Sequence, residues 1–190
     1  MKKWVVYGTL CMAAFASAGQ TGQKDRTQAI WAIAAERMQR QNDLWFKNGD
    51  YPRVIQSMRF LAILFPHNYD IVTNLGWMLE NVEKRTEALA IYIKYRENFP
   101  DDPEASFPEA DYYFKKKVYE KVPSLIEPSL KVGSGPSPNS YRILAHSYER
   151  LNLLSDSARI WKQYVQKHPD DLPAKNNLTR VEKKMHGTGG

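Results

Sequence analysis

The sequence predicts an all-helical protein built from a repeated pair of helices. Three four-residue segments with proline in second place recur along the chain, namely Phe65–Asn68, Phe99–Asp102 and His168–Asp171. They begin at positions 65, 99 and 168, so the second interval is one more than twice the first. A fixed period of this length is typical of helical solenoids, whose usual role is to bind other proteins. No segment shows sustained period-two alternation, so we expect no sheet.

Residues 1–18 have the pattern of a signal peptide. Met1-Lys2-Lys3 is a cationic start, the run 4–18 is uncharged and mostly apolar, and Ala16-Ser17-Ala18 supplies the small residues that a signal peptidase accepts. We therefore expect cleavage after Ala18 and a periplasmic or secreted protein.

Two other interpretations of this segment stay open. A retained membrane anchor is less favoured, because the run is about five residues short of a spanning helix. A lipoprotein would use Cys11, but the preceding Gly8-Thr9-Leu10 does not resemble the leucine, small, small order of a lipobox.

Removal of residues 1–18 changes the composition. The formal net charge of +6 falls to +4, because Lys2 and Lys3 leave and 25 basic residues then face 21 acidic ones. Cys11 is the only cysteine in the chain, so disulfides contribute nothing to the remainder. We expect residues 19–186 to form one helical repeat domain held by packing alone.

The helices expected before residue 103 come in two pairs. Residues 27–47 lack proline and glycine and are rich in helix formers, and Asn48-Gly49-Asp50 ends that helix. Pro52 fits the first turn of the next helix, where its missing N–H has no partner to lose, and Pro66 closes it. The second pair is expected over residues 69–81 and 86–98.

The stretch 103–137 departs from this pattern. Pro108, Pro123 and Pro128 fall where helices are expected, and proline inside a helix costs about 3 kcal/mol. We expect a helix over 109–121, a short one over 124–131 and a flexible connection from Gly133 to Pro138. A decayed repeat is the favoured interpretation, and a hinge or partner-specific insertion is the alternative. A further pair follows over 140–150 and 156–167, then a cap helix over 172–185 and a disordered tail over 187–190.

Overlaying the segments at the repeat spacing supports a common register. Equivalent positions keep apolar or small side chains in four sets: Trp45, Leu79 and Tyr148; Val54, Ala88 and Ser157; Met58, Tyr92 and Trp161; Leu61, Tyr95 and Tyr164. A fifth set, Asn42, Gly76 and Ala145, holds small or modest side chains where two helices could cross closely.

On these residues the chain resembles the tetratricopeptide-repeat family. The unit 69–102 matches its motif at Leu75-Gly76, Ala88, Tyr92 and Pro100. The unit 35–68 keeps Gly49, Tyr51 and Pro66 but has Gln41-Asn42 in place of Leu-Gly, and the unit 138–171 keeps Tyr141, Leu144-Ala145, Tyr148 and Pro169. The resemblance implies an all-α, right-handed superhelical solenoid of antiparallel helix pairs. It would have about four units, the third (103–137) degenerate, and the C-terminal cap helix.

The resemblance also implies where partners bind, since the first helix of each pair lines the concave side in that family. In the second unit the stripe opposite the core-facing residues contains Trp77, for which burial against a neighbouring helix is the alternative. The candidate groove residues are Gln39, Asp43, Phe46, Thr73, Asn74, Trp77, Glu80, Arg142, His146 and Glu149. Aromatic and arginine side chains often dominate binding energy, so we expect a peptide or helix of an envelope protein as partner.

Other classes of function fare less well on the sequence. His67, His146, His168 and His186 show no metal-ligand spacing, and no phosphate-binding glycine loop occurs, so we expect no enzyme, cofactor or metal. A nucleic-acid site could use Lys115-Lys116-Lys117 beside Tyr112, Tyr113 and Phe114, but export argues against it. The sequence favours an interaction scaffold or adaptor of the cell envelope, with a membrane-anchored assembly factor subunit as the alternative. Membrane contact is expected only if the signal segment is retained, and the pattern indicates no oligomeric state.

Overall fold

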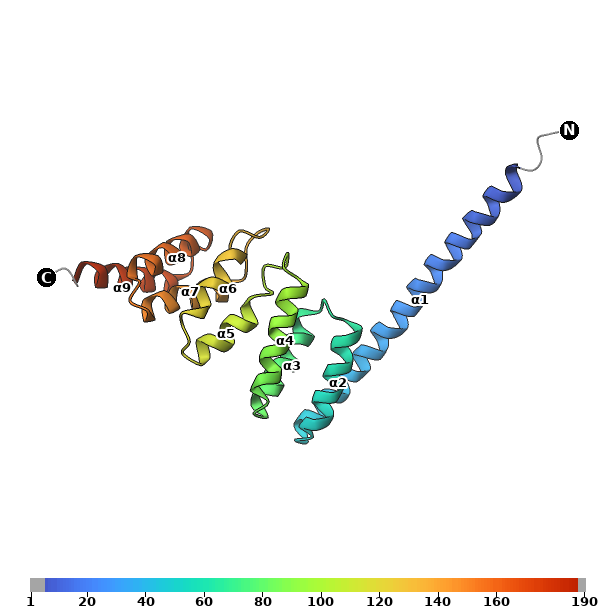
Figure 1. Cartoon of the computed structure of the whole chain (residues 1–190), viewed down its shortest axis with the longest axis horizontal. Helices are drawn as coiled ribbons and strands as arrows, with labels where there is room; N and C mark the ends of the chain where they lie inside the picture. Colours follow the sequence, from blue (N-terminus) through green and yellow to red (C-terminus); the bar gives the residue numbers. More distant parts are fainter. Residues whose placement is uncertain (1–5, 188–190) are drawn as a thin grey trace. The chain divides into compact units, whose positions relative to one another are not determined.

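A computed structural model describes the backbone of residues 6–187 and the side chains of residues 26–187 (Figure 1). All regular structure in the described residues is helical, which confirms the all-α prediction. The chain divides into two units, Met1–Ser57 and Met58–Gly190, and each is described by itself. Of the signal segment, residues 1–5 lie outside the described residues, and so do the side chains up to residue 25.

The helices follow one another through short turns. Their bounds are α1 Val6–Lys47, α2 Tyr51–Leu64, α3 Tyr69–Asn81, α4 Arg85–Asn98, α5 Phe107–Lys115, α6 Lys121–Ser129, α7 Pro138–Arg150, α8 Leu154–Lys167 and α9 Leu172–Gly187. The first helix was expected to begin near residue 27. It begins at Val6 instead, and residues 6–26 belong to the same continuous helix. The predicted tail also began too early: Gly187 is the last residue of α9, and residues 188–190 lie outside the described part.

The first unit contains α1 and the start of α2. The turn between them has Gly49 in the left-handed region at φ +74°, and the Asp50 amide donates to the Trp45 carbonyl at 2.8 Å. A left-handed residue after a helix is usually glycine, because glycine has no Cβ to clash with the backbone in this conformation. Asn42, Val54 and Ile55 are buried. Among the residues that were searched, no helix is long and apolar enough to cross a membrane.

The second unit stacks helices in chain order (Figure 1). α3 packs on α4, α5 on α6, α7 on α8 and α8 on α9, while α4 contacts α5 and α6 contacts α7. Gly76 explains how closely α3 and α4 cross, because a Cβ there would lie 2.1 Å from the Tyr92 ring. The small residue that the overlay placed at this position is therefore required by packing.

Two of the three recurring proline segments cap the helices that follow them. The Asn68 side chain accepts a hydrogen bond from the Ile71 amide at 3.1 Å, at the start of α3. Asp171 does the same for the Ala174 amide at 3.0 Å, at the start of α9. The last residue of each of these two segments thus satisfies a backbone N–H that a helix start would leave without a partner.

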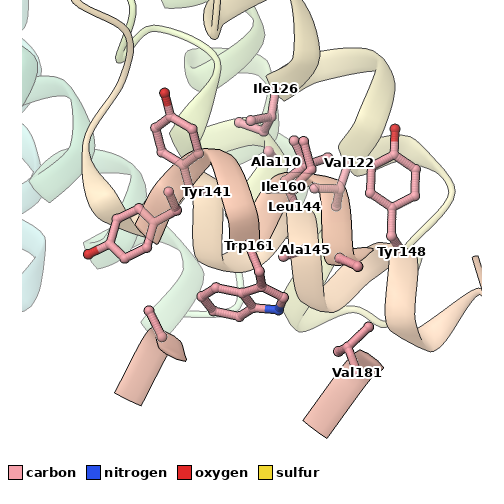
Figure 2. Close-up of a cluster of buried hydrophobic side chains, with 13 residues drawn as sticks. Ala110, Val122, Ile126, Tyr141, Leu144, Ala145, Tyr148, Ile160, Trp161 and Val181 are labelled. Carbon is pink, nitrogen blue, oxygen red and sulfur yellow. The ribbon is translucent and has the colours of Figure 1, made fainter. Parts of the chain in front are cut away.

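A single apolar cluster joins five helices of the second unit (Figure 2). Ala110 of α5, Ile126 of α6, Leu144 of α7 and Ile160 of α8 are all fully buried in it. Val181 of the cap helix α9 completes the cluster, also with no exposed surface. The residues of the four overlay sets are all buried except Trp45 and Met58, which are partly buried.

Two of the three prolines in the third repeat lie at the starts of short helices. Pro108 lies at the start of α5 and Pro123 in the first turn of α6, where no helical N–H is lost. The predicted helix 109–121 is therefore wrong at its end: α5 stops at Lys115, and the following turn places Lys117 at φ +61°. The predicted helix 124–131 is likewise shifted, since α6 runs from Lys121 to Ser129 with Pro128 inside it.

Candidate functional site

Four residues on the first helices of the second unit share one register. Trp77 on α3, Asp111 on α5, His146 on α7 and Arg180 on α9 follow one another at the repeat period, with one extra position between Asp111 and His146. We call the surface that they mark the first-helix face. The side chain of Trp77 is 47% exposed, and the other three are exposed or half-buried. Sequence reasoning had placed Trp77 and His146 on this face.

The residues around Trp77 are ordered by local hydrogen bonds. The Thr73 hydroxyl donates to the Tyr69 carbonyl at 2.9 Å, and Glu80 accepts from the hydroxyl of the buried Tyr92 at 3.0 Å. Asn74 is exposed. Because Glu80 links α3 to α4, its carboxylate has a structural partner as well as a surface position.

The three candidates before residue 50 belong to the first unit. Gln39, Asp43 and Phe46 all lie on α1 and are exposed. The Phe46 ring packs edge-on against Tyr51, with ring centres 5.6 Å apart.

Arg142 has a structural role that the sequence did not reveal. Its guanidinium donates to Asp171 at 2.8 Å and to the Tyr164 hydroxyl at 3.3 Å. The Tyr164 hydroxyl also donates to Asp171, at 2.7 Å. Hydrogen bonds from Tyr164, Ala174 and Arg142 lower the pKa of Asp171 from 3.8 to about 2. Arg142 thus joins α7 to the start of α9.

A cavity of about 420 Å³ lies where α5, α7 and α9 approach one another. We call it the basic pocket, and its lining residues are Phe114, His146, Glu149, Arg150, Arg180 and Lys184. A cavity of this volume is within the range of ligand sites. The structure thus brings together two predicted groove residues, His146 and Glu149, with four that the prediction left out.

Glu149 is the anionic centre of the basic pocket. Arg180 holds it through both oxygens, one of the bonds at 2.8 Å, and the Lys184 ammonium donates to it at 2.6 Å. Its side chain is only 11% exposed. The hydrogen bonds from Arg180, together with the one from Lys184, lower the pKa of Glu149 from 4.5 to about 2. Burial acts in the opposite direction.

His146 borders the same pocket. Burial lowers its pKa, and the charges of Arg180 and Arg150 act in the same direction, whereas Glu149 opposes them. The imidazole packs edge-on against the buried Trp161, with ring centres 5.2 Å apart. Because its pKa is lowered, the imidazole that lines the pocket is uncharged at neutral pH.

Three of the four overlooked residues follow from the repeat register, and the fourth is a sequence neighbour of a predicted one. Arg180 lies one repeat period after His146, Lys184 one period after Arg150, and Phe114 one period after Glu80. Extending the register into α5 and into the cap helix would have found Phe114, Arg180 and Lys184, and Arg150 directly follows the predicted Glu149.

The lysine run near residue 116 lies at the end of α5. Lys115 pairs with Asp111 at 2.6 Å, and the Lys116 ammonium lies 5.8 Å from the centre of the Tyr112 ring. Phe114 packs edge-on against Tyr119 at 5.5 Å between ring centres. These aromatic rings therefore contact the protein itself.

No metal site emerges from the part of the chain that was searched: there, no three His, Cys, Asp or Glu side chains come close enough to hold an ion.

The paired helices, the repeat register and the Gly76 crossing define a tetratricopeptide-repeat fold, as the sequence led us to expect. No protein-family profile matches the sequence, and no curated protein matches it. Solved structures do resemble it. A MamA crystal structure superposes with a TM-score of 0.61 at 12% identity, over 78% of this chain and 81% of that one. MamA from residue 41 to the end, from Desulfovibrio magneticus RS-1, gives 0.53 at 14% identity, over 82% and 97%. At these identities the likeness is one of fold.

Proposed function

We propose that this chain is a protein-interaction scaffold of the cell envelope, exported through residues 1–18, and that its first-helix face binds a peptide or helix of a partner. The exposure of Trp77 carries the proposal, since a tryptophan that is 47% exposed on this face leaves nearly half of its surface available to a partner. Tryptophan and arginine side chains are the residues that most often anchor interfaces. The basic pocket extends the same face toward the C-terminus.

The test is capture of partners from envelope fractions by the tagged chain, quantified by mass spectrometry. Trp77→Ala should reduce capture of specific partners by about ten-fold or more, the loss expected for an anchor residue. Phe60→Ala is the matched control, because Phe60 is also an exposed aromatic (42%) but lies on α2, a second helix. Equal capture by both variants would refute binding on this face.

The membrane-anchored alternative differs only at the N-terminus. Sequencing of the N-terminus after cell fractionation separates the two: a start at Gly19 in a soluble envelope fraction supports export with cleavage. An intact residue 1–18 segment in the membrane fraction supports a retained anchor.

A further inference from the structure

We propose that the basic pocket binds a carboxylate side chain of the partner, so that the segment on the first-helix face is acidic at one end. This inference rests on the proposed function, because it states the chemistry of the bound segment. The pocket contains three permanent cations, Arg150, Arg180 and Lys184, against the one carboxylate of Glu149. The residues that line the pocket therefore have a formal net charge of +2, which attracts an anionic ligand.

Arg150 is the cation best placed to contact such a ligand. Its side chain is exposed at the pocket, and among the described residues it forms no hydrogen bond or ion pair. A guanidinium offers two parallel N–H donors that match the two oxygens of a carboxylate. A carboxylate bound there would take up a charge that the fold leaves uncompensated.

Glu149 positions the other two cations. Its bonds to Arg180 and Lys184 hold both side chains of α9 against α7 before any ligand arrives. Cations fixed in this way lose little freedom on binding. Phe114 supplies an apolar wall on the side of α5, which suits the methylene groups of a Glu side chain.

The charge pattern along the face favours a peptide over a polyanion. Toward the N-terminus the face continues with Asp111, which Lys115 neutralises, and then with Trp77 and Glu80. Nucleic acids and anionic membranes need an extended basic surface. Here the cations of the first-helix face gather at the pocket, and toward the N-terminus the face carries two carboxylates and an aromatic side chain instead.

The experiment measures binding of two fluorescent peptides of about ten residues, one alternating Glu and Leu and one alternating Gln and Leu, to the chain from residue 19 in about 0.1 M salt. We expect the Glu peptide to bind at least about ten-fold more tightly. Arg150→Glu should weaken its binding about ten-fold or more, and the control Lys175→Glu should change it less than about two-fold. Lys175 is exposed on α9 outside the pocket and carries the same charge change.

Three results would overturn the inference: similar affinity for both peptides, including binding of neither; equal weakening by the two variants; or tighter, Arg150-dependent binding of an oligothymidylate than of the Glu peptide. The Trp77→Ala variant separates this failure from failure of the proposed function. If the two peptides bind with similar affinity and Trp77→Ala weakens both, the face binds peptides without acidic selectivity. If only Arg150→Glu matters, the pocket is selective and Trp77 is not an anchor.

Discussion

A single residue in the left-handed region follows the first helix of every pair. Gly49 has φ +74°, Glu83 +63°, Lys117 +61° and Asn152 +60°. Each of these residues lies one repeat period after the one before it, with one extra position before Asn152. The left-handed turn is therefore a feature of the repeat, like the buried positions. Gly49 is the residue type that this conformation favours most and Asn152 is the next, whereas the Cβ of Glu83 or Lys117 clashes with the backbone there.

Lys117→Gly should therefore stabilise the protein by about 0.5–1 kcal/mol, the relief of left-handed strain less the added freedom of the unfolded chain. Urea unfolding followed by circular dichroism measures the change. Lys116→Gly is the control: it removes the same charge one residue earlier, where φ is −82°. That variant should destabilise by about 0.5–1 kcal/mol. Destabilisation by both variants would show that the positive φ is not strained.

At the scale of elements, two carboxylates hold the cap helix in place. Asp171 caps the start of α9 and accepts hydrogen bonds from Tyr164 and Arg142. Glu149 of α7 accepts hydrogen bonds from Arg180 and Lys184, which lie in the second half of α9. Both carboxyl pKa values are lowered to about 2. Depressed pKa values mean that these groups stabilise the fold when ionised.

Acid should therefore loosen α9. The contribution of both groups is complete above about pH 4.5, the ordinary range of a carboxyl, and is lost as the pH falls toward 2. Glu149→Gln should cost about 1–2 kcal/mol at pH 7 and much less near pH 2, because the wild-type group is then protonated too. Thermal unfolding across this range measures it. Glu97→Gln, at a side chain that is 63% exposed, should keep the wild-type pH profile; if it matches Glu149→Gln, the effect is general charge loss.

The sequence predicted α3 over its whole length, and the starts or ends of most other helices within a few residues. Periodicity and proline positions sufficed there because each helix buries one regular stripe. The end of α5 was missed because Lys117 does not look like a turn residue, although the register from Gly49 leads to it. For the candidate site, spacing on one helix placed His146 and Glu149. It could not show that Arg180 reaches the pocket, because that depends on the docking of α9 on the rest of the array.

At the scale of the whole unit 58–190, stability is expected to pass between neighbours. From α3 to α9 each helix packs on the next along the chain, so the apolar surface at the C-terminal end of this array depends on the last helix, α9, to cover it. Val181 of α9 is fully buried in the cluster that contains Trp161 and Leu144 (Figure 2). The cap helix therefore protects α7 and α8 directly, and α3 and α4 only through the helices between them.

Val181→Asp should undock α9 by burying a charge without a partner, at a cost of about 3–5 kcal/mol. Hydrogen exchange resolved along the chain should show protection lost in α9 first, reduced in α7 and α8, and nearly unchanged in α3 and α4, since only neighbours share packing in a linear array. Lys183→Asp introduces the same side chain at an exposed position of α9 and should leave this pattern intact. An equal loss of protection from α3 to α9 would instead mean that the unit unfolds as one cooperative block, because coupling beyond nearest neighbours is then strong enough to spread the damage over the whole array.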